Sequence, residues 1–545
     1  MNIALAHLSR RILPAVLGVT VVAGCGGSGA SPDPAMESAA PSAPSAAASH
    51  APASPSAAVT PTAQPSGADD PALKPFYGQQ VAWSACADDP MTKEVNESSF
   101  LCGTAHVPLD YAHPAGDTFD LALVKKPAAQ SVQKLGSLFF NPGGPGGSGI
   151  DMVTGGAASQ FKSLNDRYDL IGFDPRGVGR SSAVHCLDDA ARDQLNALDH
   201  ADGGTGKAFA DACQAKSAKL LPFVGTVNAA RDLDVLRAVV GDQKLNYLGF
   251  SYGTYLGGFY AEQFPDRTGR LVLDGVVDPT LSQLDAGIAQ QVGFEGVFER
   301  FAADCVTHSG CSLGKDPGAA AKKAADFLDG LEAHPMTGTD GRKLTSAEGW
   351  TGTLDMLYGD AKSWEYLRDG LAWAMQGHKA DYLLEFADDY NGRDGQGHYN
   401  NLADANVAIN CADDGSPIPT DDQIQQALQQ LHDKAPYLDR RVTAEDLKAQ
   451  DCRAWPFHSA PPPHVIKAAG SAPILVVGST GDDATPYAGA QKVAANLANA
   501  TLLTRDGDGH TAYSKSACIK KDVDAFLIDG TMPPAGTHCP TDSAG

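Results

Sequence analysis

The hydrophobic residues in the first and last parts of the chain form short, nearly continuous runs. Such runs are typical of strands that are buried on both faces of a sheet. The strands that we expect cover residues 121–124, 138–141, 168–174, 245–250, 271–274, 474–478 and 501–504. Helical patterns, such as 229–240 and 255–264, lie between several of these runs. Strands that alternate with helices predict an α/β fold with a mostly parallel, doubly wound sheet.

Between residues 281 and 463 the pattern changes, because helical periodicity dominates and strand-like runs are nearly absent. The helices that we expect there cover residues 293–303, 319–333, 347–358, 363–375 and 421–432. We interpret this region as a helical cap inserted into the sheet domain. Trp350, Trp364 and Trp373 belong to it. They could line a substrate pocket, but we expect at least two of them to pack between helices.

The N-terminus carries a pattern that is typical of export signals. Two arginines precede an apolar run over residues 12–23, and residues 22–25 read Val-Ala-Gly-Cys. The run is too short for a permanent membrane helix, which needs about 20 residues. Its ending resembles a bacterial lipobox, so we interpret residues 1–25 as a lipoprotein-type signal peptide whose Cys25 is lipidated. The alternative is an ordinary secretory signal with an incidental cysteine. Both predict an exported protein, which the first interpretation anchors in the cell envelope and the second leaves secreted.

Residues 26–75 consist mainly of Ala, Pro, Ser and Gly and contain few large apolar side chains. Such a segment cannot bury a core, and we expect a disordered tether between the membrane and the globular part. The rest of the chain then divides into three segments. Residues 76–280 and 464–545 form the two parts of the sheet domain, and residues 281–463 form the cap.

The formal net charge of the 545-residue chain is −24. A nucleic-acid partner requires a basic face that neutralises phosphates, so this charge argues against one. With 43% hydrophobic and 19% charged residues, the composition is that of a globular protein. The membrane contact that we expect is limited to the lipid anchor at Cys25.

Ten cysteines follow Cys25, and none of them belongs to a C-x-x-C pair. An even number without such a pair favours disulfides over a zinc site, and we expect no metal. Sequence does not determine the connectivity. Pairing of nearest neighbours gives 86–102, 186–213, 305–311, 411–452 and 518–539. The alternative, ten buried free thiols, suits a cytosolic protein and conflicts with the export signal.

The stretch around Ser251 reads Gly-Phe-Ser-Tyr-Gly from residue 249 to residue 253. A strand-like run precedes it and a helical pattern of small residues follows it, which is the context that the G-x-S-x-G turn requires. This predicts Ser251 as a nucleophile on a strained turn, with Gly249 and Gly253 leaving room for neighbouring backbone. The alternative is a chance match in a chain with 58 glycines. The flanking pattern argues against that alternative.

A nucleophilic serine needs a base, usually a histidine that a carboxylate orients. In α/β-hydrolases the acid and then the histidine follow the last strands of the sheet. His510 lies among small residues in the loop after the last expected strand, and Asp482 lies in the loop after the strand before it. Asp483 is adjacent to Asp482 and competes with it. Asp506 and Asp508 also compete, but we expect them in surface turns.

The oxyanion that forms during acyl transfer needs two donors aimed at it. One donor that we expect is the backbone N–H of Tyr252, the residue after the nucleophile. The loop after strand 138–141 is rich in glycine, which lets backbone approach a substrate closely. Gly144 is our candidate for the second donor, with Gly143 as the alternative. A phosphate-binding loop is the competing interpretation, and the missing G-K-[ST] ending argues against it.

These motifs together resemble the tripeptidyl aminopeptidase family of exported bacterial α/β-hydrolases, relatives of prolyl aminopeptidase. The resemblance covers about residues 76–539 and is weakest in the cap. The segments that carry it are 141–146, 172–177, 249–254, 481–487 and 509–510. It implies an α/β-hydrolase fold and assigns the acid to Asp482, although family members usually carry another residue where Asp483 stands. We expect Asp174 and Arg176 to brace a turn beside the nucleophile.

The resemblance implies a serine exopeptidase that releases short peptides or single residues from the free N-terminus of peptide substrates, without metal or cofactor. Such an enzyme needs an acid that binds the ammonium group of the substrate. Asp413, in a segment similar to one in the family's cap, is our candidate, and a plain surface acid is the alternative. Two other hypotheses remain: an esterase or lipase with the same triad, and a non-catalytic binding lipoprotein.

Overall fold

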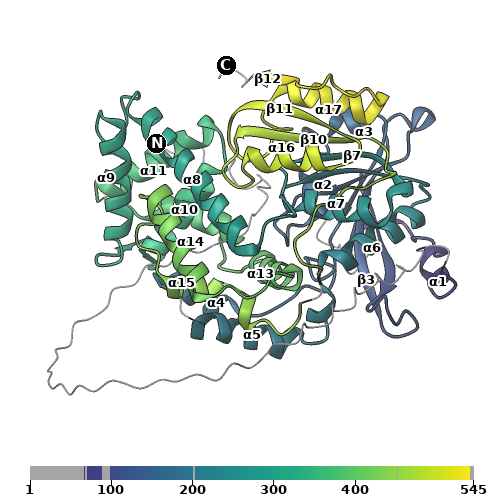
Figure 1. The fold of residues 1–545 in the computed structure, drawn as a ribbon, viewed down its shortest axis with the longest axis horizontal. Helices are drawn as coiled ribbons and strands as arrows, with labels where there is room; N and C mark the ends of the chain where they lie inside the picture. The colour runs from purple at the N-terminus through teal and green to yellow at the C-terminus, as the bar shows by residue number, and fades with distance from the viewer. Residues whose placement is uncertain are drawn as a thin grey trace, which may run out of the picture.

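The computed structural model describes Gly67 and residues 70–88, 99–200, 203–377, 379–450, 452–458 and 460–540. The expected signal peptide with Cys25, and most of the expected tether, lie outside these residues. Figure 1 shows a sheet with helices on both faces and a helical body beside it. The globular part begins slightly earlier than residue 76, because Leu73 is already buried in the core.

Ten strands form one sheet in the order β1-β2-β3-β5-β4-β6-β7-β10-β11-β12. From β5 to β12 every neighbouring pair is parallel. These strands are β5 (Asp169–Phe173), β4 (Ser137–Asn141), β6 (Leu245–Phe250), β7 (Thr268–Asp274), β10 (Ile474–Gly481), β11 (Ala500–Asp508) and β12 (His538–Pro540). The order places β6, which leads to Ser251, in the middle of the sheet.

The other three strands, β1 (Ser84–Ala85), β2 (Leu101–Pro108) and β3 (Thr118–Lys126), pair antiparallel at one edge. All seven expected strands are present, and the mostly parallel sheet is confirmed. Strand β2 was missed because glycine, histidine and proline interrupt its apolar run. Strand β12 was missed because it has only three residues.

Helices cover both faces of the sheet, as a doubly wound topology requires. The helices packed on one face are α1 (Lys74–Tyr77), α6 (Thr226–Val239), α7 (Tyr252–Gln263) and α16 (Tyr487–Asn496). Those on the other face are α2 (Gly149–Gly156), α3 (Lys162–Asn165) and α17 (Ala517–Asp529). The buried side chains of the strands alternate between these two cores.

The cap consists mainly of helices and lies between β7 and β10 in the chain. Its helices are α8 (Gln283–Cys305), α9 (Pro317–Gly330), α10 (Ser346–Leu357), α11 (Ala361–Met375), α12 (Asp381–Asn391), α13 (Leu402–Asp413), α14 (Asp421–Lys434) and α15 (Ala444–Gln450). A small hairpin of β8 (Met336–Thr337) and β9 (Lys343–Leu344) joins α9 to α10. The five expected helices are present, whereas α12, α13 and α15 were not anticipated.

The cap also includes residues that precede its expected start at residue 281. Helices α4 (Asp189–Asn196) and α5 (Gly203–Ser217) lie beside the cap helices in Figure 1. Arg192 forms an ion pair with Asp404, and the N–H of Ala347 donates to Asp199 at 2.8 Å. The expected start of the cap at residue 281 was too late. It followed the order of the chain, whereas α4 and α5 lie between β5 and β6 in the sequence.

The tryptophans of the cap behave largely as expected. Trp364 is buried and packs edge-on against Phe301. The ring of Trp350 packs at a tilt against Phe298, and its indole N–H donates to Asp329 at 2.9 Å. Trp373 is 44% exposed. Two of the three therefore serve the packing between helices.

Five disulfides join the ten cysteines in consecutive pairs, as nearest-neighbour pairing predicted. The pairs are Cys86–Cys102, Cys186–Cys213, Cys305–Cys311, Cys411–Cys452 and Cys518–Cys539. Each closes a loop of at most 41 residues, so each restrains the unfolded chain locally.

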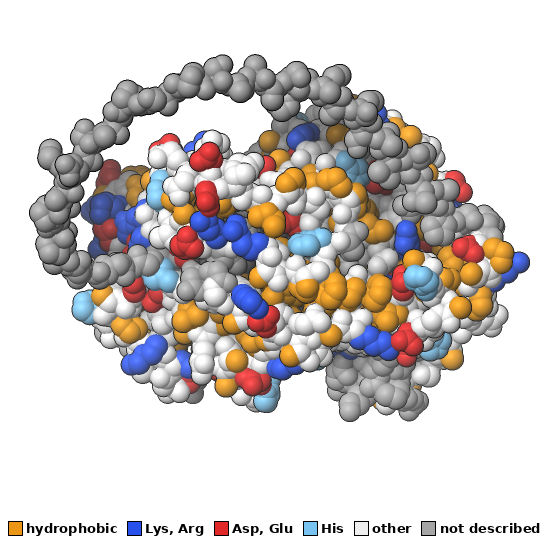
Figure 2. Space-filling model, turned by 60° about the horizontal axis from the view of Figure 1, so that its bottom comes forward, with side chains coloured by type: hydrophobic (Ala, Val, Ile, Leu, Met, Phe, Trp, Pro, Cys, Tyr) orange, Lys and Arg blue, Asp and Glu red, His pale blue; other side chains and the backbone are white. Residues whose placement is uncertain are grey.

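The surface carries charges of both signs. On the face shown in Figure 2, Lys and Arg side chains lie among Asp, Glu and scattered hydrophobic side chains. Across the described part of the chain, helices long and apolar enough to cross a bilayer are not found.

The cap core contains a carboxyl group without a partner. Asp439 is fully buried, and neither of its carboxylate oxygens has a hydrogen-bond partner among the described residues. Burial, and then the charge of Glu295, raise the pKa of Asp439 to about 8. The neighbouring Glu295 accepts the N–H groups of Tyr437 and Leu438. Asp439 therefore holds its proton in the folded protein at neutral pH.

We expect the stability contributed by this proton to depend on pH. The carboxyl loses its proton near pH 4 in the unfolded chain and at about pH 8 in the folded one. The contribution is thus full below about pH 4 and is lost as the pH rises through about 8. In thermal unfolding, the Tm of the wild type should fall relative to that of Asp439→Asn between about pH 5 and about pH 9. The exposed Asp422→Asn is the control, and equal pH dependence of wild type and Asp439→Asn would contradict the buried proton.

Candidate active site

Ser251 lies on a sharp turn between β6 and α7. Its backbone has φ 55° and ψ −125°, a strained conformation for a residue with a side chain. A Cβ on Gly249 would lie 2.5 Å from the carbonyl oxygen of Gly253, and one on Gly253 would lie 2.7 Å from that of Asn141. Both glycines are therefore required by close backbone packing, as the sequence motif predicted.

His510 and Asp482 meet at the carboxyl ends of β10 and β11. His510 Nδ1 lies 2.9 Å from Asp482 Oδ1, and both side chains are almost completely buried. The second carboxylate oxygen accepts the N–H of Thr511 at 3.1 Å, and Oδ1 also accepts the N–H of Thr485 at 2.8 Å. These contacts fix the carboxylate and, through it, the imidazole ring.

The charge state of Asp482 follows from these partners. Burial on its own raises the pKa of this carboxyl, but the charge and hydrogen bond of His510 and the N–H groups of Thr485 and Thr511 outweigh burial, so the pKa falls below its ordinary value. Asp482 is therefore ionised at neutral pH and can stabilise an imidazolium.

The competing acids are in different surroundings. Asp483 is fully buried, its oxygens lack hydrogen-bond partners among the described residues, and burial followed by the charge of Asp482 raises its pKa well above the ordinary value. Asp506 and Asp508 lie at the end of β11 and not in surface turns as expected, because the strand continues to Asp508. Asp506 lies 2.9 Å from His538, and Asp508 lies 2.6 Å from Arg300. The carboxylate bonded to His510 is thus that of Asp482.

Ser251 and His510 both lie against the end of β7. The N–H of Ser251 donates to the carbonyl of Asp274 at 2.9 Å. The next residue is Gly275, where a Cβ would lie 3.0 Å from His510 Cε1. Neither Ser251 Oγ nor His510 Nε2 has a hydrogen-bond partner within the described ranges, and both atoms are buried. The serine hydroxyl and the imidazole nitrogen are the groups that exchange a proton in a serine hydrolase. Here both lie on adjoining elements and form no hydrogen bond with another described residue.

The glycine loop after β4 lies directly against Ser251. A Cβ on Gly143 would lie 2.8 Å from Ser251 Cβ and 3.1 Å from the backbone nitrogen of Tyr252. The N–H of Gly143 already donates to Asn141 Oδ1 at 2.9 Å, which favours Gly144 as the donor to an oxyanion. Tyr252 is the first residue of α7, so its N–H has no acceptor inside the helix.

The cap contacts the loop that carries His510 through Tyr358, which follows α10. Its carbonyl oxygen accepts the N–H of His510 at 3.0 Å and Lys515 Nζ at 2.9 Å, and Lys515 also donates to the carbonyl of His510. The ring of Tyr358 packs edge-on against the imidazole. Sequence reasoning missed Tyr358 and Lys515, because nothing in a helical pattern indicates which cap residue reaches the histidine loop.

A second cap element, α13, lies on the glycine loop. Asn406 Nδ2 donates to the carbonyl of Pro145 at 3.1 Å, and a Cβ on Gly146 would lie 2.7 Å from the carbonyl oxygen of Leu402. At the end of α13, Asp413 accepts the N–H of Thr226 at 2.7 Å and also its hydroxyl. Thr226 in turn contacts the hydroxyl of Tyr252. Asp413 thus lies one side chain away from the residue after the nucleophile.

Asp413 differs from a plain surface acid. Burial raises its pKa to about 7, against the opposing effect of the two bonds from Thr226. The residue is partly exposed, and its carboxylate stabilises the N-terminus of α6. Its ionised form would gain from a cation nearby.

The turn formed by Asp174 and Arg176 is structural, as expected. Asp174 accepts the N–H of Arg180 at 2.9 Å, and Arg176 forms two bonds with Asp232, at 2.6 and 2.7 Å. Both side chains are fully buried. They hold the loop after β5 and do not contact Ser251.

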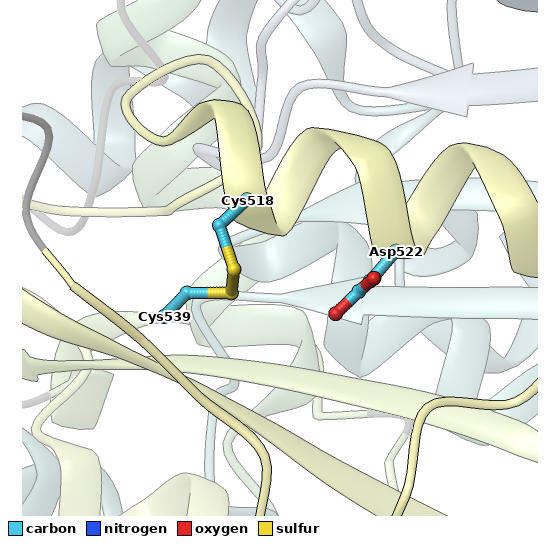
Figure 3. Close-up of side chains that lie close together, drawn as sticks. All are labelled: Cys518, Asp522 and Cys539. Atoms are coloured by element: carbon cyan, nitrogen blue, oxygen red, sulfur yellow. A yellow bond between two sulfur atoms is a disulfide. The ribbon is translucent and has the colours of Figure 1, made fainter.

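Figure 3 shows the one cluster of potential metal ligands in the described residues, Cys518, Asp522 and Cys539. The two cysteines form a disulfide, so their sulfurs are not thiolate ligands. The two cysteines of this cluster therefore form a covalent link between α17 and β12.

The chain is similar to known proteins over most of its length. A family model described as TAP-like protein matches residues 439–539. The serine protease Hip1 of Mycobacterium tuberculosis is 40% identical over 489 residues, which cover 86% of this chain and 92% of that protein. Carboxylesterase B of the same species is 36% identical over 493 residues, which cover 88% of this chain and 93% of that protein.

A tripeptidyl aminopeptidase of Streptomyces lividans is 31% identical over 499 residues, covering 84% of this chain and 86% of that protein. These similarities extend through the sheet domain and the cap. Together with the sheet order and the serine turn, they show that this chain belongs to the tripeptidyl aminopeptidase-like family of α/β-hydrolases and is a serine hydrolase with peptidase activity.

Proposed function

We propose that the protein is a serine exopeptidase that hydrolyses peptide bonds near the free N-terminus of peptides through Ser251, His510 and Asp482. The observation that carries the proposal is the bond between His510 Nδ1 and the ionised, buried Asp482, with His510 Nε2 and Ser251 Oγ both left without partners. An imidazole held in this way presents Nε2 as a base.

In the proposed mechanism, Ser251 Oγ attacks the scissile carbonyl while His510 Nε2 takes its proton. The imidazolium is stabilised by Asp482 and then gives the proton to the leaving amine. Water, activated by the same histidine, hydrolyses the acyl-enzyme. The N–H groups of Gly144 and Tyr252 donate to the oxyanion, and removal of one such donor typically costs about 10²–10³ in kcat.

Asp413 is the proposed binding group for the ammonium of the substrate. It is close to the nucleophile through Thr226 and Tyr252, and burial hinders its ionisation when it is alone. A bound ammonium would favour the ionised carboxylate, so ion pairing and substrate binding would support each other. This assignment restricts the substrates to peptides with a free amine.

We also propose that the protein is exported and anchored by a lipid on Cys25. The support is the sequence of residues 1–25, together with five disulfides, which persist in oxidising compartments. Residues 26–75 would then separate the enzyme from the membrane.

An esterase on the same fold is the second candidate, because a relative that is 36% identical is named carboxylesterase B. The same triad cleaves both esters and amides, so the site geometry alone does not separate the two activities. The binding-lipoprotein hypothesis lacks support, because the relatives are named as enzymes and the three triad residues are present.

Removal of the Ser251 hydroxyl tests the proposed nucleophile. We expect Ser251→Ala to lower turnover of aminoacyl and tripeptidyl reporter amides by roughly 10⁴–10⁶, because no other group can form the acyl-enzyme. A fluorophosphonate probe should label the wild type at Ser251 and fail to label the variant. The Tm should change little, and undiminished turnover by folded Ser251→Ala would refute the mechanism.

The second prediction separates an exopeptidase from an esterase. N-acetylation of a tripeptidyl reporter amide should lower kcat/KM by at least about 100-fold, because the blocked substrate cannot form an ion pair with the enzyme. Equal kcat/KM for the free and acetylated amides, alongside fast hydrolysis of an unrelated ester, would favour the esterase.

The third prediction tests Asp413. Asp413→Asn should raise KM for free-amine substrates by about 10–100-fold and leave hydrolysis of an activated neutral ester within about twofold, because the ester needs no cation-binding group. Thr226→Val serves as the matched control, since it removes a partner of Asp413 and keeps the charge. An equal loss on the ester would assign Asp413 a purely structural role.

A further inference from the structure

Asp274, the last residue of β7, occupies a central place beside the site. It pairs in register with Phe250 of β6 on one side and with Val477 of β10 on the other. It is fully buried. The strand thus places this carboxylate between the strand that leads to Ser251 and the strand that leads to Asp482.

Asp274 contacts the elements of two catalytic residues at once. Its backbone carbonyl accepts the N–H of Ser251 at 2.9 Å. Its carboxylate accepts the N–H of Ala512 at 2.9 Å and that of Tyr513 at 2.8 Å, immediately beyond the histidine loop. Asp274 therefore connects the turn of Ser251 to the loop of His510 and sets the distance between them.

The histidine loop needs such an anchor because its backbone is strained. Thr511, next to His510, has φ 63°, a region that β-branched residues rarely adopt. Strain of this kind persists only where the surroundings determine the conformation. The N–H of Thr511 is bound by Asp482, and the next two N–H groups are bound by Asp274. The two carboxylates hold three consecutive N–H groups.

We propose that Asp274 is a positioning residue of the catalytic site, whose carboxylate holds the strained turn after His510 and so aligns the imidazole with Ser251. The proposal rests on the proposed triad. Asp274 itself does not contact the reacting atoms, and it acts through the backbone of Ala512 and Tyr513. No sequence motif pointed to it.

The charge of Asp274 is consistent with this role. The pKa of its carboxyl is raised to about 6, mainly by burial. The N–H groups of Tyr513 and Ala512 lower this pKa, the charge of Asp482 raises it, and the charge of His510 lowers it. At the pH of a typical assay, about 8, the group is ionised, as a two-oxygen acceptor of N–H bonds should be.

The test compares Asp274→Asn and Asp274→Ala with the wild type at about pH 8, on a peptide amide and on an activated ester. A displacement of the imidazole by about 1 Å costs about 100-fold. We expect kcat to fall by about 10-fold in the Asn variant, which keeps one acceptor oxygen, and by about 100-fold in the Ala variant, with KM within about twofold. Labelling of Ser251 by a fluorophosphonate should slow in parallel.

Asp232→Asn is the matched control, because Asp232 is also buried but is bonded to Arg176 and Tyr111, which are not part of the histidine loop. It should lower the Tm and leave kcat within about twofold. If both Asp274 variants keep wild-type kcat below their unfolding temperatures, Asp274 is only structural and the proposal is wrong.

A second variant tests the strain directly. Glycine adopts positive φ without strain, so Thr511→Gly in the Asp274→Ala background should recover at least about fivefold of the lost kcat. A double variant no more active than Asp274→Ala would overturn the role assigned to the carboxylate. Failure of the proposed function gives a different result. In that case Ser251→Ala stays active, or the enzyme hydrolyses the ester and not the peptide. The effect of the Asp274 variants can then still be measured with the ester.

Discussion

The close approach of backbone to backbone at the carboxyl ends of β4 and β6 is the constraint on which the site depends. Gly249 and Gly253 face each other and Asn141 at distances that leave no room for a Cβ. This packing accompanies the positive φ of Ser251, as the turn between a strand and a helix requires. The same packing brings the glycine loop against the backbone nitrogen of Tyr252. The proposed nucleophile and the proposed oxyanion donors therefore arise from one local arrangement.

The histidine side of the site is built differently, from buried charge rather than from glycine. Asp482 and Asp274 bind consecutive N–H groups after His510, and Lys515 binds carbonyl oxygens on the other side of the loop. Asp482 and Asp274 are buried, and each accepts hydrogen bonds from backbone N–H groups. Because Tyr358 of the cap shares these bonds, the position of the cap and the orientation of the imidazole are coupled.

Sequence predicted the parts that depend on local rules. The strands, the serine turn and the acid–histidine pair follow from apolar runs and from the position of loops after strands, and the structure brings Asp482 and His510 together. Asp274 also ended an expected strand, but nothing local distinguishes an anchor from any other buried acid. Tyr358 could not be found, because its contact with His510 joins residues 152 positions apart through cap packing. The cap boundary was missed for the same reason, since α4 and α5 join the cap through tertiary contacts such as Arg192–Asp404.

The consecutive order of the disulfides has a consequence for biogenesis. Consider a chain that passes through a membrane pore with its N-terminus first. Because the disulfides join consecutive cysteines, the first cysteine of each pair emerges shortly before its native partner. At most one of these ten cysteines is then unpaired outside the pore at any time. Oxidation during passage therefore yields the native connectivity without reshuffling. On the proposed route of export, maturation would depend on a thiol oxidant and would not require a disulfide isomerase.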